Sequence, residues 1–162
     1  FEVSPLLVDY ASSGATTRGA DDISILTADI TGWDDEIGTF VVEHGQMLGS
    51  ERLLSGESNA AVLFKSTNIA TYNLSASLNS ANGDVTTAGD HTSAVAGDTS
   101  GRSITVDGAA VTSDSNTFIG TDITRLDIGK QDNNSNYLNG HIARITYYPT
   151  RLSDAALQAL TA

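Results

Sequence analysis

Short runs of β-forming residues recur along almost the whole chain of 162 residues. Turn-forming residues, chiefly Gly, Asn, Asp and Ser, separate these runs at intervals of about eight to twelve residues, the spacing typical of a β-sandwich. Roughly ten to twelve short strands are predicted in this way. No stretch before Ser153 has helical periodicity, and no repeat of fixed length occurs. The sequence therefore predicts one all-β domain of two antiparallel sheets.

Ile69–Leu78 shows the most regular alternation in the chain. In TYNLSASLN every second residue is apolar, so a single strand there would have one apolar and one polar face. We expect the polar face, with Asn73 and Ser75, to line a concave sheet surface. Two further predictions are a strand over Gly38–His44 and a tight type I′ hairpin at Asp107-Gly108.

The last quarter of the chain, residues 138–162, predicts a strand followed by a short helix. Strict alternation in HIARITYY would place Ile145 and Tyr147 on one face of the strand and Ile142 and Tyr148 on the other. Pro149 would end the strand, because proline has no N–H to donate.

The segment after this proline has the signals of a helix N-terminus. Ser153 is placed to act as the N-cap, and Asp154 in the first turn complements the helix dipole. Leu152 and Leu157 have the spacing of a hydrophobic staple. We therefore expect a small docked helix to close the domain.

This closing stretch resembles the C-terminal signature of the concanavalin A-like, laminin-G-like jelly-roll superfamily. In the similar members, a final G-x-I-x-x-[VIL] strand, an aromatic pair and a proline precede R-L-S-[DN]-A-x-L-Q-A-L. The matching residues here are Gly140, Ile142, Ile145, Tyr147, Tyr148, Pro149 and Arg151–Leu160. The form is closest to the distal domains of phage and prophage tail fibres and of bacterial surface proteins. The resemblance implies a concanavalin A-like antiparallel jelly roll with a short C-terminal α-helix.

A second point of resemblance is TTRGADDISI at residues 16–25, which is similar to the junction after an upstream module in tail-fibre proteins. It implies a jelly roll over residues 18–162, with residues 1–17 as a linker or a first edge strand from the upstream module. Since the chain begins with Phe1 rather than Met, we expect it to be a piece of a longer protein.

Composition excludes several classes of function. The formal net charge is −12 and only eight Lys and Arg residues are present, whereas nucleic-acid binding needs clustered positive charge. Cysteine is absent, which excludes disulfides, thiol nucleophiles and thiolate metal sites. No apolar run approaches the length of a membrane span.

Patterns that could support catalysis are weak. The run at residues 33–36 places carboxylates beside Trp33, as a glycosidase needs, but the E-x-D-x-x-E pattern of the jelly-roll glucanases is missing and consecutive acids indicate a solvated turn. The histidines at 44, 91 and 141 lack ligand spacing, and no nucleophile elbow or phosphate loop occurs. We therefore expect no enzymatic activity. A divergent polysaccharide hydrolase or lyase ranks third among the possible functions, after the two that are described below.

Asp132, Asn134 and Asn136 carry side-chain oxygens at alternate positions, as at the start of a calcium-binding loop. The carboxylate that closes such a loop is missing, because Ala143 occupies its position, and Tyr137 stands where Gly is needed. A helix–loop–helix site is therefore excluded. A structural calcium ion held by the three oxygen-bearing residues and backbone carbonyls is one prediction, and a polar turn without metal is the other.

The remaining function is recognition of a carbohydrate. Sugars are held by an aromatic platform that packs on their C–H faces and by fixed polar groups that hydrogen-bond their hydroxyls. The predicted ligand-binding residues are Trp33, Asn73, Ser75, Asp132, Asn133, Asn134, Asn136 and Tyr137. For Trp33, packing in the core or at its rim is the alternative.

Together these features predict a non-catalytic, lectin-like module of a larger phage tail-fibre or secreted surface protein, extracellular or on the virion surface. Its partner would be a cell-surface or extracellular polysaccharide, and neither nucleic acid nor a membrane. The alternative is a structural module of a surface fibre that assembles as a homo-oligomer, such as a trimer, and binds no ligand.

Overall fold

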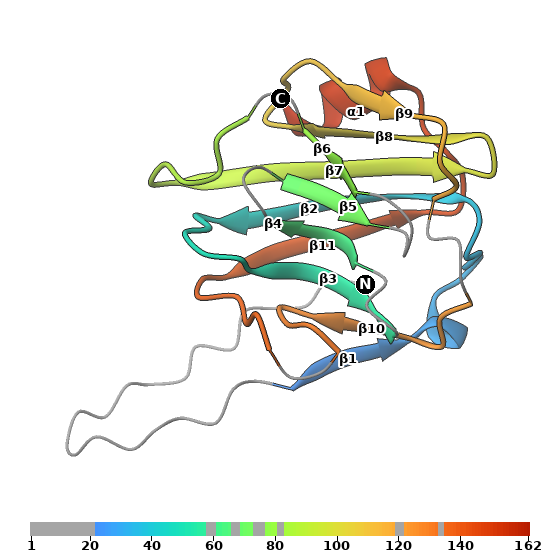
Figure 1. The fold of residues 1–162 in the computed structure, drawn as a ribbon, viewed down its shortest axis with the longest axis horizontal. Helices are drawn as coiled ribbons and strands as arrows, with labels where there is room; N and C mark the ends of the chain where they lie inside the picture. Colours follow the sequence, from blue (N-terminus) through green and yellow to red (C-terminus); the bar gives the residue numbers. More distant parts are fainter. Residues whose placement is uncertain are drawn as a thin grey trace.

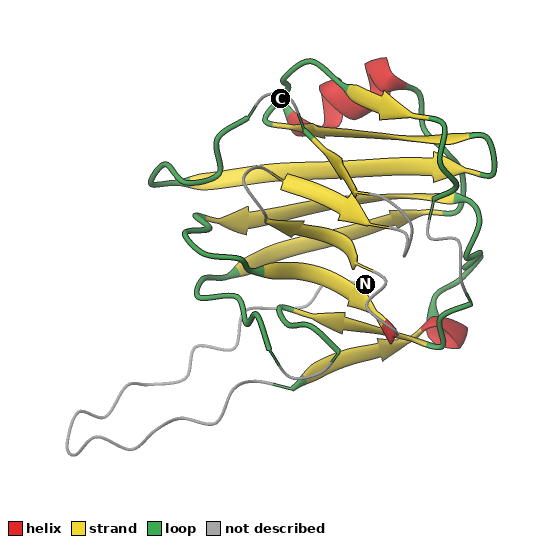
Figure 2. Cartoon of the chain, viewed as in Figure 1, coloured by secondary structure: helices red, strands yellow, loops and turns green. Residues whose placement is uncertain are grey.

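The computed structural model describes residues 22–57, 61–65, 69–72, 77–80, 83–118, 122–132 and 135–162. In this part of the chain eleven strands form two antiparallel sheets that pack face to face (Figure 1, Figure 2). The six-stranded sheet has the order β1 (Ile23–Leu26), β10 (Arg125–Ile128), β3 (Arg52–Gly56), β4 (Ala61–Lys65), β5 (Ile69–Tyr72) and β6 (Ser77–Asn79). The five-stranded sheet has the order β11 (Ile142–Tyr148), β2 (Gly38–Gly45), β7 (Asp90–Asp98), β8 (Gly101–Val106) and β9 (Thr112–Asp114). The predicted all-β jelly-roll sandwich is confirmed.

The main hydrophobic core lies between the two sheets. Phe40 and Val42 point into it from β2, and Leu54 and Leu63 meet them from β3 and β4. Fully burying each of these side chains contributes about 1.5–3 kcal/mol. The period-two pattern of β2 therefore fixes which of its faces looks into this core, and the strand predicted over Gly38–His44 is confirmed.

The C-terminal helix α1 (Asp154–Thr161) covers the outer face of the five-stranded sheet. Ser153 is its N-cap, because the Ser153 side chain accepts a hydrogen bond from the backbone N–H of Ala156 at 3.3 Å. Leu157 is buried in a second apolar cluster against β2 and β7, and Leu152 packs on the same cluster. Both the capping and the staple predictions are confirmed.

The prediction of one strand over Ile69–Leu78 is wrong. Two strands, β5 and β6, pair antiparallel there, with Tyr72 opposite Ser77. The chain therefore reverses direction between these two residues. Asn and Ser favour turns as readily as a polar strand face, and a hairpin pairs backbone groups that one edge strand would leave open. Asn73 and Ser75, predicted to line a sheet surface, lie outside the described residues.

A β-bulge near the start of β11 corrects a second prediction. Two residues of β11, Ala143 and Arg144, lie opposite the single residue Glu43 of β2. The extra residue shifts the alternation by one, so Ile142 and Ile145 both pack against the main core. Strict alternation would have placed these two side chains on opposite faces.

Asp107 and Gly108 form the predicted turn. Both have positive φ, 48° and 67°, as a type I′ turn requires, and the N–H of Ala109 donates to the Val106 carbonyl at 2.9 Å. Strand β9 begins only at Thr112, so the hairpin is longer than the two-residue form that the sequence predicted.

The short 3₁₀ helix η1 (Thr27–Asp29) lies between β1 and β2. Within the described part of the chain, no helix combines the length and the apolar character that a membrane crossing needs. The domain boundary predicted at residue 18 lies outside the described residues.

Candidate functional site

The predicted site residues that the structure describes lie at opposite ends of the sandwich. Trp33 comes just before β2 and packs where this strand begins, with its ring 5.4 Å from the ring of Tyr147. The described residues of the Asn-rich loop, 129–132 and 135–138, lie beyond the other end of β2, on the left of Figure 1, whereas η1 lies on the right. The structure therefore does not bring Trp33 together with Asp132, Asn136 and Tyr137.

Trp33 is half-buried and packed in the rim of the core. Its ring lies against Phe40 as well as Tyr147, and its Nε1–H donates to Oδ1 of Asp35 at 3.1 Å. The same Asp35 oxygen accepts the backbone N–H of Ile123 at 3.1 Å. The carboxylate next to Trp33 therefore fixes a turn, which agrees with the interpretation of residues 34–36 as a turn.

The Asn-rich loop is folded back on β3 by backbone hydrogen bonds. Gly129, with φ 71°, donates to the Leu53 carbonyl at 3.0 Å, and the N–H of Arg52 donates to the Asn136 carbonyl at 3.1 Å. Leu138 then returns to the Gly129 carbonyl at 2.8 Å. Asn136 has φ 50°, a left-handed conformation that Asn tolerates better than most residues. Asn133 and Asn134 lie outside the described residues.

Gln131 is the polar centre of this loop. Its Oε1 accepts hydrogen bonds from Asn136 Nδ2 at 2.5 Å, from Arg52 Nη2 at 3.4 Å and from Ser135 Oγ at 3.4 Å. Sequence reasoning missed both Gln131 and Arg52, since neither stands in a motif. Only the pairing of β3 with β10 brings Arg52, which is distant in sequence, beside the loop.

Charged groups surround this centre. Burial lowers the pKa of Arg52 and the nearby Asp132 raises it, but a guanidinium keeps its charge at any physiological pH. Glu51, next to Arg52, is only 6% exposed, and its Oε2 accepts no hydrogen bond from any described residue. Tyr137 is 38% exposed and offers an aromatic surface to solvent beside these groups.

The three oxygen-bearing positions proposed for calcium are placed only in part, because Asn134 lies outside the described residues. Asp132 Oδ1 is buried within the loop, while Asn136 uses its amide to bind Gln131. Among the described residues, no group of three or more His, Cys, Asp or Glu side chains is arranged to hold a metal ion.

His44 and His91 come together although they are far apart in sequence. They are register partners on β2 and β7, both point between the sheets, and their ring centroids are 6.0 Å apart. His44 Nε2 lies 2.9 Å from Ser93 Oγ, but His44 is 1% exposed and Ser93 is fully buried. This serine–histidine pair is closed to a substrate from solvent and therefore has no place in nucleophilic catalysis.

Comparison with known proteins shows what the fold resembles. No protein-family model and no curated protein matches the sequence. Among solved structures, the CBM40 of the Ruminococcus gnavus IT-sialidase bound to α2,6-sialyllactose is similar, with 19% identity over 78% of this chain and 84% of that chain and a TM-score of 0.62.

Two larger proteins share the fold over part of their length. The Trypanosoma rangeli sialidase matches with 18% identity over 78% of this chain and 22% of its own, at a TM-score of 0.57. The leech intramolecular trans-sialidase matches with 17% identity over 88% of this chain and 26% of its own, at a TM-score of 0.59. The chain therefore has the β-sandwich fold found in the carbohydrate-binding module and the two sialidases.

Proposed function

We propose that this domain is a non-catalytic carbohydrate-binding module. The observation that supports it most is the likeness to the Ruminococcus gnavus CBM40, which extends over most of both chains and concerns a module whose structure contains sialyllactose. Fold alone does not define a ligand, so the proposal also needs a site with suitable chemistry.

The Asn-rich loop supplies that chemistry. Tyr137 offers an exposed ring for the C–H face of a sugar, and the exposed Asn136 offers its amide oxygen for a hydroxyl, since its Nδ2 already donates to Gln131. Asp132, whose Oδ1 is buried within the loop, would have to contribute through Oδ2. Arg52, half-buried and donating from Nη2 to Gln131, adds a positive charge that attracts a carboxylate. An acidic sugar such as sialic acid is therefore the first ligand to test. Trp33, at the other end of the sandwich, lies outside this proposed site.

The parent protein is proposed to be a secreted surface protein or a phage tail fibre that presents the module outside the cell or on the virion. The resemblance of residues 138–162 to the closing segment of such proteins supports this context. Several copies on one fibre would bind a polysaccharide with avidity even when each site is weak.

Titration by NMR tests the proposal directly. We expect α2,6- or α2,3-sialyllactose to shift the amide signals of Arg52 and Tyr137, while lactose at the same concentration has a much smaller effect. Tyr137→Ala and Arg52→Gln should each weaken binding at least about tenfold, the loss of roughly 1.4 kcal/mol of contact. The matched control is Leu160→Ala, which removes an exposed apolar side chain from α1. A broad panel of acidic and neutral glycans that shifts no signal of the loop would contradict the proposal.

A structural module remains the second candidate, and the edge strand β1 favours it. Ile23, Ile25 and Leu26 are all exposed on this strand, and one of its edges pairs with no strand among the described residues. Apolar edge strands promote association between chains. Light scattering tests the structural candidate. A stable trimer that binds no glycan would support a structural module, and a monomer at high protein concentration would contradict it.

A further inference from the structure

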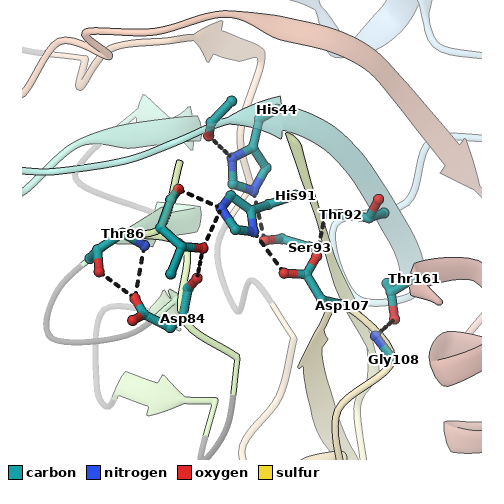
Figure 3. A network of polar contacts seen from close by, with 11 residues as sticks. His44, Asp84, Thr86, His91, Thr92, Ser93, Asp107, Gly108 and Thr161 are labelled. Carbon is teal, nitrogen blue, oxygen red and sulfur yellow. Dashed lines mark hydrogen bonds and ion pairs between the residues drawn. The ribbon is translucent and has the colours of Figure 1, made fainter. Parts of the chain in front are cut away.

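A group of polar side chains lies between the sheets at the end of the sandwich where β2 finishes (Figure 3). We call His44, Thr87, His91, Ser93 and Asp107 the histidine cluster. The rings of His44 and His91 are 1% and 6% exposed, and both face the interior. Buried polar groups of this kind must find hydrogen-bond partners, so their contacts define their protonation.

His44 needs only one proton to satisfy its contacts. Its Nδ1 lies 2.7 Å from the Gly45 carbonyl, which can only accept, so Nδ1 carries the proton. Its Nε2 lies 2.9 Å from Ser93 Oγ, and the serine hydroxyl can donate to it. Desolvation lowers the pKa of His44, and the nearby His91 lowers it further. The neutral ring therefore fits this position.

His91 needs two protons. Its Nδ1 lies 2.7 Å from Oδ2 of Asp107 and its Nε2 lies 3.1 Å from the Thr87 carbonyl. A carboxylate and a carbonyl both accept and cannot donate, so only the imidazolium ion makes both hydrogen bonds. The Asp107 carboxylate is itself held in place, because its Oδ1 accepts the backbone N–H of Thr92 at 2.7 Å.

These contacts join three parts of the chain. Thr87 belongs to the loop of residues 83–89, which is also anchored by the Val85 side chain, buried in the main core, and by two hydrogen bonds. The N–H of Met47 donates to the Val85 carbonyl at 2.8 Å, and Gln46 Nε2 donates to the Thr86 carbonyl. Asp107 begins the turn whose Gly108 N–H donates to Thr161 Oγ1 in α1 at 3.0 Å. His91 therefore connects the loop to the turn, and the turn is connected to the helix.

We propose that His91 is a proton-dependent clamp: its imidazolium holds Thr87 of the 83–89 loop against the turn at residues 106–109, and loss of the Nε2 proton loosens this part of the loop. After that loss, the Nε2 lone pair would face the Thr87 carbonyl. Thr87 Oγ1, 3.5 Å from Nε2, now donates to the Asp84 carbonyl at 3.2 Å and would have to turn away from it. The hydrogen bond from Nε2 to the Thr87 carbonyl is therefore lost, and we expect Thr87 to shift away from the ring. The clamp does not depend on whether the module binds a glycan.

The charges around His91 act in both directions. Desolvation lowers the pKa of His91, but the hydrogen bonds with Asp107 and Thr87, helped by the charge of Asp84, outweigh it and raise the pKa above its ordinary value. The neutral His44 ring faces it from β2. At the surface beside it, Asp90 pairs with His141 at 3.2 Å. The clamp therefore stays closed to a higher pH than an ordinary histidine would allow and opens as the pH rises further.

NMR on the 162-residue chain tests the clamp. At about pH 6, below the ordinary histidine pKa, the ring nitrogens of His91 should both carry protons while His44 carries one, on Nδ1. Hydrogen-exchange protection of the Met47 and Thr86 amides should fall about tenfold as the pH rises from about 6, below the ordinary histidine pKa, to about 9. The amide of Ser100, which donates to Asp98 at the other end of the sandwich, should keep its protection.

Two variants separate the clamp from general destabilisation. His91→Gln should lower the protection of the loop at both pH values and remove its pH dependence. Asp107→Asn keeps a residue that tolerates positive φ and can still accept the Thr92 N–H, but it removes the carboxylate, so the release should move to lower pH. His141→Gln, at the exposed pair, should behave as the unmodified chain. A singly protonated His91 at about pH 6, or an unchanged midpoint in Asp107→Asn, would overturn the proposal.

Discussion

Replacing Trp33 by alanine should cost stability and leave carbohydrate binding intact. The ring pairs with Phe40 and Tyr147 contribute about 0.5–1.5 kcal/mol each, and the hydrogen bond to Asp35 adds about 1 kcal/mol. The expected loss in the free energy of unfolding is therefore about 3 kcal/mol. This value is at the low end of the range for tryptophan-to-alanine changes in a core, because the Trp33 ring is only half-buried. For a chain of this length, that loss lowers the melting temperature by about 6–12 °C.

Tyr137→Ala is the matched control for this prediction. It removes an aromatic ring at the other end of the sandwich that is 38% exposed, and we expect less than about 0.5 kcal/mol of lost stability. Urea unfolding followed by circular dichroism, together with glycan titration, should show opposite effects: Trp33→Ala unfolds earlier and binds normally, and Tyr137→Ala unfolds normally and binds weakly. Unchanged stability in Trp33→Ala together with lost binding would refute this reasoning and make Trp33 the sugar platform.

Three further predictions concern charge. Asp114→Ala removes the bidentate partner of the fully buried Arg102 and should cost about 3 kcal/mol in urea unfolding. Desolvation raises the pKa of Asp114, but hydrogen bonds from Arg102 outweigh this effect, so the pKa is lowered in the folded protein. The stabilisation by the Arg102–Asp114 pair should therefore be complete above about pH 4 and disappear as the pH falls further. In the folded protein the pKa of His44 is lowered, chiefly by desolvation, so the free energy of unfolding should decrease as the pH falls below about 6.5. The pKa of His91 is raised, so the free energy of unfolding should also decrease as the pH rises above about 6.5. His91→Gln should remove this alkaline decrease when stability is measured against pH. If the Asn-rich loop holds calcium, EDTA should lower the melting temperature by about 5–10 °C, and Asp132→Asn should remove this response; a melting temperature that ignores EDTA contradicts the calcium prediction.

The sequence predicted those elements whose signals are local. The helix α1 is specified by its own cap and staple, β2 by its alternation, and the turn at Asp107-Gly108 by two residues that accept positive φ. Each of these depends on residues a few positions apart. None requires knowledge of which strand lies beside which.

Features that depend on strand pairing could not be predicted in the same way. The hairpin of β5 and β6 contains polar residues that also suit one face of a strand, so alternation alone favoured the wrong structure. The bulge at Ala143 is defined only against Glu43 of β2. The meeting of His44 with His91 depends on the register between β2 and β7, and that of Arg52 with the Asn-rich loop on β3 and β10.

The candidate site shows the same division. Tyr137 and Asp132 were proposed as ligand-binding residues from residue type, because an aromatic residue next to a run of Asn and Asp is a local pattern. Trp33 was grouped with them by chemistry, although the length of β2 separates the two ends of the sandwich. Residue type predicts which groups can bind a sugar, and only the fold determines which of them can act together.

The separation of the two ends also bears on how such a domain can diversify. Eight residues of β2 extend over about 25 Å, far beyond the range at which substitutions influence each other's effects. Changes in the loops near Arg52 and Tyr137 should therefore add to, and not interact with, changes around Trp33. Substitutions in the loops near Arg52 and Tyr137 can therefore change the binding specificity, while the aromatic packing around Trp33 keeps the domain folded.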